Sequence, residues 1–288
     1  MFYRLVLRLL NWVIPERLFS RLVGVLARRN WPAFILQPFL RWYCRKFDVN
    51  MDEARYPLKH YKNFIEFFTR PLKEGIRPID QSPQKIISPV DGKIYSYGTI
   101  KKDTIIQAKG VSYTIEELLD DSEKAQLFYD GSFIIIYLSP RDYHRIHTPI
   151  DGSVEGFRYI PGKLLPVNPP SVALFPKLFV ENERLASYLN TEQIGQVAEV
   201  KVGATIVGRI RLSYIDYYTN RWITPRSKHQ QLDEPVPLKK GDELGMFELG
   251  STVILLFQKG VTFLNTLKVE DPLILGEHIA NIDKIEEN

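Results

Sequence analysis

The chain has 288 residues, a length that allows one or two domains, and its formal net charge is +4. The hydrophobic fraction of 44% and the charged fraction of 25% are those of an ordinary folded protein and argue against extensive disorder. Cys44 is the single cysteine, which excludes an internal disulfide framework and any metal site that needs several cysteine ligands. No run of roughly 18 consecutive apolar residues occurs, so the sequence predicts no conventional membrane-spanning helix.

The charge is unevenly distributed along the chain. Residues 1–47 contain nine arginines and lysines and one acid, Glu16, and therefore carry +8, whereas the rest of the chain carries −4. A basic end on a mildly acidic body indicates that the N-terminal segment binds an anionic partner.

Hydrophobic periodicity predicts amphipathic helices in this basic region. Apolar residues recur at helical spacing over residues 2–13 and 18–26, with arginines on the opposite face. A third apolar stretch, residues 31–40, contains Pro32 and Pro38 and is expected to be broken by them. Aromatic, aliphatic and arginine side chains in this arrangement suit helices that lie in a bilayer interface. Near an anionic leaflet each basic residue contributes about 1 kcal/mol, so the sequence predicts a membrane-associating region.

Three other interpretations of residues 1–47 remain open. The helices could pack on the core of the protein itself, which is the usual reason for amphipathicity. They could bind nucleic acid, although leucine-rich helices that are poor in lysine are weak candidates, and we predict no nucleic-acid partner. They could form a mitochondrial targeting peptide, but such peptides are rich in serine, and Ser20 is the only serine before residue 82.

The remainder of the chain shows mainly strand signals. Residues 133–138 and 253–257 are continuous apolar runs of the length of buried strands. Residues 63–66 predict the capped start of a short helix, and residues 114–117 predict a capping box for another. The sequence therefore predicts an α+β fold, in which a mostly antiparallel β body with short helices follows the amphipathic region. We place the domain boundary between residues 47 and 48, so that residues 48–288 form the second domain.

One weak internal repeat contains two aspartates. Residues 88–94 resemble residues 148–154, and both segments contain a Pro-x-Asp-Gly sequence. This sequence is common in turns, so the pattern alone predicts that Asp91 and Asp151 are turn residues.

The candidate catalytic residues are two histidines and a serine. His144 and His147 directly follow the predicted strand at residues 133–138, where polar side chains are well placed to face a site. Both histidines could instead be structural, or they could bind a metal ion. Zinc needs a further protein ligand, and no residue spacing in the sequence identifies one, so we predict no metal site. Ser251 follows Gly250 and precedes a buried strand, but it lacks the Gly-x-Ser-x-Gly elbow of hydrolases, and the local pattern is usually a loop.

Several segments taken together resemble one enzyme family. Residues 88–92 (Ser-Pro-Val-Asp-Gly), 138–147 (Leu-Ser-Pro-Arg-Asp-Tyr-His-Arg-Ile-His) and 249–254 (Leu-Gly-Ser-Thr-Val-Ile) are similar to phosphatidylserine decarboxylases of the bacterial membrane-associated type. Further similar segments follow the same order along the chain, at residues 67–72, 77–80, 109–113, 161–168 and 202–205. The stretch from Pro166 to Pro176 departs from the family pattern.

The resemblance implies that the chain is a proenzyme that cuts its own Gly250–Ser251 bond. The hydroxyl of Ser251 would attack the carbonyl of Gly250, with His147 as the base and Asp91 holding the tautomer of His147. The products would be a beta chain, residues 1–250, and an alpha chain, residues 251–288, which stay together as a heterodimer. Position 251 would end as a pyruvoyl group, the covalent cofactor of the family.

The same resemblance implies the reaction. The pyruvoyl group would form a Schiff base with phosphatidylserine and accept the electrons released with carbon dioxide, so that phosphatidylethanolamine is the product. His144 is our candidate for the acid that returns a proton. The implied partners are phosphatidylserine and an anionic membrane surface, with the protein peripheral on the cytoplasmic side of the cell membrane.

Two other functions remain open from the sequence. Asp91, His147 and Ser251 could form the triad of a serine hydrolase, whose chain would stay intact. The protein could also be a membrane-surface module without enzymatic activity, in which the histidines are structural.

Overall fold

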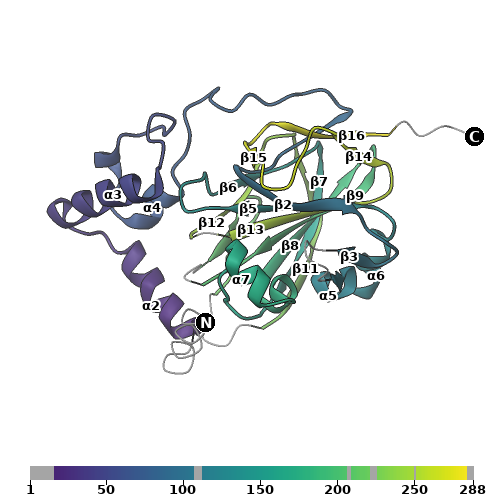
Figure 1. The fold of residues 1–288 in the computed structure, drawn as a ribbon, viewed down its shortest axis with the longest axis horizontal. Helices are drawn as coiled ribbons and strands as arrows, with labels where there is room; N and C mark the ends of the chain where they lie inside the picture. The colour runs from purple at the N-terminus through teal and green to yellow at the C-terminus, as the bar shows by residue number, and fades with distance from the viewer. Residues whose placement is uncertain (1–15, 107–111, 206–208, 221–225, 250, 284–288) are drawn as a thin grey trace, which may run out of the picture.

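The computed structural model describes residues 16–106, 112–205, 209–220, 226–249 and 251–283. The predicted first helix, at residues 2–13, lies outside the described residues. The helices near the N-terminus lie on one side of a β body, and the strands of this body come from the rest of the chain (Figure 1). The fold is therefore α+β, as the sequence predicts.

The largest sheet has eight strands among the described residues, in the order β11-β7-β8-β9-β13-β5-β2-β15, and every neighbouring pair is antiparallel. Its central strands β5, β9 and β13 are almost wholly buried, which explains why residues 133–138 of β5 and 253–257 of β13 are continuous apolar runs. The strands predicted at residues 133–138 and 253–257 are confirmed. The eight strands are β2 (Gly92–Thr99), β5 (Ser132–Leu138), β7 (Gly152–Ile160), β8 (Arg184–Thr191), β9 (Gly195–Val202), β11 (Lys228–Leu238), β13 (Ser251–Phe257) and β15 (Pro272–Leu273).

The described residues form three smaller sheets as well. One of them, in the order β10-β12-β6, carries the segment that contains both candidate histidines. Its strands are β6 (Arg145–His147), β10 (Ile210–Leu212) and β12 (Glu243–Phe247). The other two sheets are formed by β1 (Lys85–Ile87), β14 (Val261–Phe263) and β16 (His278–Ile282), and by β3 (Thr104–Ile106) and β4 (Ser112–Thr114).

The two predicted helix caps are confirmed. The side chain of Asn63 accepts a hydrogen bond from the backbone N–H of Glu66 and so begins α4 (Phe64–Phe68). Thr114 and Glu117 form a complete capping box that begins α5 (Ile115–Leu119). The other short helices are η1 (Leu58–His60), α6 (Ser122–Gln126), α7 (Pro169–Leu174) and α8 (Leu178–Glu181).

The N-terminal region contains α2 (Glu16–Arg28) and α3 (Ala33–Phe47). Pro32 directly precedes α3, but Pro38 lies inside it, so the predicted break at Pro38 is wrong. A proline in a helix interior costs about 3 kcal/mol because it removes a hydrogen bond and crowds the preceding turn. Burial of three side chains along one face of α3 opposes this cost, namely Leu36, Leu40 and Tyr43.

These two helices bury one face and expose another. The buried residues of α3 pack against α4, where the ring of Tyr43 lies 5.0 Å from that of Phe64. This contact partly supports the core-packing interpretation. The opposite face is apolar and open to solvent, and Phe34 is 79% exposed. We call this surface the apolar helical face, and it consists of Leu22, Val25, Leu26, Phe34, Ile35, Phe39 and Trp42. Within the described residues, no helix is both long and apolar enough to cross a membrane.

Candidate active site

The sheet topology brings the predicted cleavage point next to the histidine segment. Ser251, the first residue of β13, is the backbone partner of Leu138, the last residue of β5. The chain leaves β5 through a turn that leads to His144 and β6, and β6 pairs with β12. Since β12 leads back to residues 249 and 251, both ends of the histidine segment are tied to strands that adjoin the cleavage point.

The two histidines lie at different positions along β12. The backbone N–H of Phe247, three residues before Gly250, donates a hydrogen bond to the carbonyl oxygen of His144 at 3.0 Å. His147 pairs instead with Glu243, at the far end of β12. Along the strand, His144 is therefore the closer of the two to the predicted scissile bond.

Both ring nitrogens of His147 have partners. Nδ1 lies 2.7 Å from the carbonyl oxygen of Gly241, and Nε2 lies 3.1 Å from the hydroxyl of Tyr143. A carbonyl oxygen only accepts, so Nδ1 carries the proton and Nε2 accepts from Tyr143. Burial lowers the pKa of His147, against the opposing effects of the Gly241 hydrogen bond and of nearby carboxylates. The imidazole is therefore neutral near pH 7, as a general base must be.

Asp91 is bound to an arginine rather than to His147. Arg77 donates to both carboxylate oxygens of Asp91, at 3.1 and 2.6 Å, and the backbone N–H of Leu275 donates at 2.8 Å. The expected contact, in which Asp91 holds the tautomer of His147, is thus replaced by the Gly241 carbonyl. The physical reason is that a guanidinium fork matches a carboxylate at two points and neutralises it. Asp91 still lies near enough to raise the pKa of His147.

His144 lies in an aromatic and nearly dry environment. Its ring centroid is 4.0 Å from that of Phe68, and its Nδ1 donates to the carbonyl oxygen of Asp142 at 2.8 Å. Nε2 is buried and has no hydrogen-bond partner among the described residues. Burial lowers the pKa of His144 to about 3, and the charge of Arg70 adds to this effect. The structure thus holds His144 as a neutral ring with Nε2 free to accept a proton.

A pocket of about 380 Å³ adjoins the cleavage point. It is bounded by Leu249, which precedes Gly250, and by Leu138, the strand partner of Ser251. Asn168 and Thr205 are polar members of a lining that is otherwise mostly apolar. The pocket also reaches the Pro166 to Pro176 stretch. The other lining residues are Phe39, Trp42, Tyr43, Phe47, Phe64, Phe68, Tyr137, Pro140, Pro166, Val167 and Ala204.

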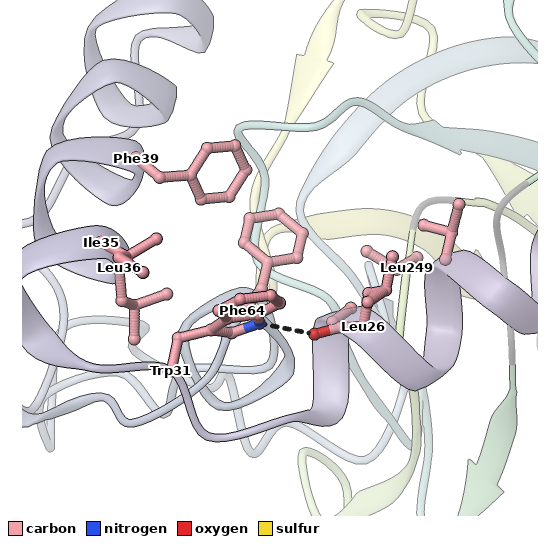
Figure 2. A pocket seen from close by; sticks show the side chains of 9 residues that line it. Leu26, Trp31, Ile35, Leu36, Phe39, Phe64 and Leu249 are labelled. Carbon is pink, nitrogen blue, oxygen red and sulfur yellow. Dashed lines mark hydrogen bonds between the residues drawn. The ribbon is translucent and has the colours of Figure 1, made fainter.

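A second pocket, of about 360 Å³, lies between α2 and α3 and is lined only by apolar residues. Figure 2 shows Phe39, Phe64 and Leu249 on its wall, and these three residues also line the first pocket. Arg28 of α2 forms an ion pair with Glu248 at 2.5 Å, which ties the helical region to the segment before the cleavage point. The two pockets therefore share a wall between the apolar helical face and the β body.

Comparison with known proteins identifies the family. The family model for phosphatidylserine decarboxylase matches residues 64–281. A relative from Myxococcus xanthus, named phosphatidylserine decarboxylase proenzyme, is 46% identical over 271 residues, which cover 94% of this chain and 96% of the relative. A relative with the same name from Vibrio parahaemolyticus is 42% identical over 281 residues, which cover 94% of this chain and 96% of the relative. Another, from Coxiella burnetii, is 40% identical over 284 residues, which cover 96% of this chain and 98% of the relative.

The chain belongs to the phosphatidylserine decarboxylase family.

Membership of the phosphatidylserine decarboxylase family confirms the resemblance found in the sequence and makes the protein a carboxy-lyase. Membership of this family excludes both alternatives from the sequence, the serine hydrolase and the membrane-surface module without enzymatic activity. The roles of Asp91, His144, His147 and Ser251 stay predictions. The structure places the first three near one another, since the backbone N–H of His147 donates to Pro89 O at 2.9 Å. Among the described residues, no cluster of three or more His, Cys, Asp or Glu side chains could hold a metal ion.

Sequence reasoning missed residues that surround the candidate site of this decarboxylase. Arg77 binds Asp91, and Tyr143 and Gly241 bind the ring of His147. Arg77 lies in a segment that contributed only to the resemblance, and Tyr143 stands beside His144 in the histidine segment. Neither side chain had a sequence signal of its own apart from these segments, and a backbone carbonyl such as that of Gly241 leaves no mark on a sequence.

Proposed function

We propose that the protein converts phosphatidylserine to phosphatidylethanolamine with a pyruvoyl group that it makes from Ser251. The observation that carries this proposal is the position of residue 251 at the start of a buried central strand, beside a mostly apolar pocket, in a chain of this family. Because β13 lies between β9 and β5, the alpha chain, residues 251–288, would stay hydrogen-bonded to the beta chain, residues 1–250, after cleavage. The two chains would thus form a stable heterodimer.

Self-cleavage begins with attack of the Ser251 hydroxyl on the carbonyl carbon of Gly250. The hydroxyl proton passes to a base, the amide nitrogen of residue 251 takes a proton as the C–N bond breaks, and an ester forms. β-Elimination then releases the carboxylate of Gly250 and leaves dehydroalanine, which water converts to pyruvoyl and ammonia. A neutral His147 supplies the base, and the negative charge of Asp91 favours the imidazolium that forms.

Decarboxylation uses the pocket beside residue 251. The pyruvoyl ketone binds the substrate amine and supplies the electron sink for loss of carbon dioxide. The surroundings fit such a group, because a mostly apolar lining excludes water and strengthens electrostatic interactions. The net reaction consumes one proton at the carbon that loses carbon dioxide. His144, neutral at rest with Nε2 unpaired, takes up this proton and delivers it.

The helical region would present the lipid to the site. The pocket between α2 and α3 is apolar and suits a hydrocarbon chain, and its wall adjoins the pocket at residue 251. The apolar helical face would enter the bilayer interface, where the exposed side chains of Arg41, Arg45 and Lys46 meet anionic headgroups. In this proposal residues 1–47 are the membrane-associating part, residues 48–288 are the catalytic part, and the protein is peripheral on the cytoplasmic side of the cell membrane.

The intact mass of the purified chain tests the cofactor. We expect two species that correspond to residues 1–250 and 251–288, with the smaller one lighter than its encoded mass by the change from serine to pyruvoyl. Borohydride should reduce the smaller species and abolish release of carbon dioxide from phosphatidylserine. Ser251→Ala should remain uncut and inactive. An uncut wild-type chain that still releases carbon dioxide would overturn the proposal.

Flotation with liposomes tests the membrane surface. The double variant Phe34→Ser/Trp42→Ser removes two exposed rings from the apolar helical face and should lower binding to anionic vesicles at least several-fold. Val269→Ser is the matched control, because Val269 is 47% exposed in the β body. Equal binding by the double variant and the control would exclude the helical face as the docking surface.

A further inference from the structure

Arg70 is a buried cation that has no acidic partner in the part of the chain that the structure describes. Its side chain follows α4 and is 3% exposed, and it forms no ion pair within the described residues. Nε and Nη1 are buried and have no hydrogen-bond partner there either. The ring of Phe67, whose centroid is 5.7 Å from the guanidinium carbon, compensates for only part of the lost hydration. Burial accordingly lowers the pKa of Arg70.

A buried charge of this kind is costly for stability. An apolar side chain of similar volume usually serves packing as well or better, because it carries no desolvation penalty. Unsatisfied buried donors in a native structure therefore point to a role other than packing. The partners of Arg70 indicate which role this is.

The one nitrogen of Arg70 that does bind holds the turn before His144. Nη2 donates to the carbonyl oxygen of Arg141 at 2.8 Å and lies 3.5 Å from that of Asp142. The carbonyl oxygen of Asp142 is also the acceptor for Nδ1 of His144. Arg70 and His144 thus share one acceptor, and the arginine fixes the peptide that sets the tautomer of the imidazole.

Two neighbours of Arg70 contact the same segment. The ring of Phe68 packs on the ring of His144, and the carbonyl oxygen of Thr69 accepts from Nε of Arg145 at 2.9 Å. Residues 68–70 therefore hold the segment before, at and after His144. Arg70 is the member of this group that carries charge.

We infer that Arg70 is a positioning residue for decarboxylation, which holds His144 with Nδ1 protonated and Nε2 without a protein partner among the described residues. This inference rests on the role of His144 in the proposed function. It assigns Arg70 no part in self-cleavage, because the ring of His147 is held separately by Tyr143 and Gly241. A planar, permanently charged guanidinium suits this task better than a flexible ammonium.

The test compares Arg70→Gln and Arg70→Lys with the wild type, as full-length proteins. Self-cleavage is followed by intact mass, and kcat and KM are measured with phosphatidylserine in mixed detergent micelles. We expect both variants to be cut, with kcat lowered about 10- to 100-fold in Arg70→Gln, the loss typical of a misplaced catalytic group, and KM changed less than about twofold. Arg70→Lys should lose less, because it keeps the charge.

The pH profile of kcat is the readout that a structural role would not move. Loss of the Arg70 charge raises the pKa of His144, so the alkaline limb, where the acid loses its proton, should move to higher pH in Arg70→Gln and stay in place in Arg70→Lys. The other charged groups in this turn are Asp142, whose carboxylate accepts from the backbone N–H of Ser139, and Arg141, whose Nε lies 3.7 Å from that carboxylate, and neither is changed in the variants.

Arg184→Gln is the matched control. Arg184 is also buried and also donates to backbone carbonyl oxygens, those of Glu117, Leu118, Val180 and Asn182, away from His144. It should leave kcat and its pH profile unchanged. A wild-type kcat and profile in Arg70→Gln, or equal losses in the Arg70 and Arg184 variants, would overturn the inference.

The remaining outcomes are also decisive. If Arg70→Gln does not fold, Arg70→Lys decides, and an unchanged kcat in it would refute the inference. A wild-type protein that is uncut or inactive would refute the proposed function itself, and this failure is visible before any variant is compared.

Discussion

His144 and His147 are three residues apart, yet their surroundings differ in almost every physical respect. The ring of His147 is bound at both nitrogens, and burial lowers its pKa against the opposing effects of the Gly241 hydrogen bond and of the carboxylates of Glu243 and Asp91. The ring of His144 is bound at one nitrogen, packs on Phe68, and lies near the positive charge of Arg70, which lowers its pKa. Burial favours a neutral ring at both positions, but the carboxylates near His147 favour an imidazolium, whereas the positive charge near His144 opposes one.

This difference suits two separate reactions. Self-cleavage needs a base that gains a positive charge as serine attacks, and carboxylates near His147 stabilise that charge. Decarboxylation needs a group that returns a proton to carbon, and in the proposed function this is His144, whose Nε2 has no hydrogen-bond partner among the described residues. The two reactions should therefore be separable by mutation.

Substitution of His147 should have the largest effect. His147→Ala removes the proposed base, so cleavage should slow by about 10²- to 10⁴-fold, and without the pyruvoyl group decarboxylation should be absent. Intact mass over a time course measures the uncut fraction. His229→Ala, in an exposed histidine of β11, is the control and should be cut normally. Normal cleavage of His147→Ala would show that His147 is not the base for self-cleavage.

Substitution of His144 should leave cleavage intact and slow only the second reaction. His144→Gln lacks a group that can cycle a proton, so kcat for carbon dioxide release should fall by about 10²- to 10⁴-fold in a fully cut protein. Reduction by borohydride confirms that the cofactor is present. A His144 variant that remains uncut would show that the two histidines share one task.

Asp91 offers a smaller and more graded effect. Asp91→Asn removes the carboxylate that raises the pKa of His147, so we expect cleavage to slow about tenfold, the equivalent of about 1.4 kcal/mol. It also breaks an ion pair in which both side chains are about 10% exposed, which should lower the free energy of unfolding by about 3–5 kcal/mol.

Glu53→Gln separates these two effects of Asp91. Glu53 is the other carboxylate on Arg77, but its side chain is 30% exposed, so its loss should cost about 0–1 kcal/mol and leave cleavage unchanged. Cleavage is measured by intact mass, and stability by urea denaturation. If Glu53→Gln slows cleavage as much as Asp91→Asn does, the effect comes from Arg77 rather than from the charge near His147.

The elements that the sequence predicted correctly are those whose signals are local. Continuous apolar runs identified β5 and β13 because both faces of these strands are buried, and the caps of α4 and α5 were visible because an N-cap and its third-position acid are close in sequence. The passage of α3 through Pro38 was missed, since it depends on buried contacts with α4 that no local pattern records.

The candidate site was predicted less completely than the fold. Its histidines, aspartate and serine came from the resemblance and from short motifs. Their partners did not, because Arg77 meets Asp91 across 14 residues, and the carbonyl of Gly241 meets His147 across 94. Arg70 was hidden for a different reason, since it acts on backbone carbonyls, which every residue possesses.

The neutral ring of His144 predicts a further effect, on stability, which develops only as the pH falls. Its pKa is about 3 in the folded protein and about 6.5 when unfolded, so between these values the unfolded chain binds more protons. Stability is therefore lost as pH falls through this window, by about 1.4 kcal/mol per pH unit. Ser251→Ala provides an uncut chain in which urea denaturation measures this slope. Adding His144→Gln should remove that share of the slope, whereas carboxylate titration is common to both proteins and cancels in the difference. An unchanged slope would mean that His144 is not held neutral, and the contrast with His147 would then rest on geometry alone.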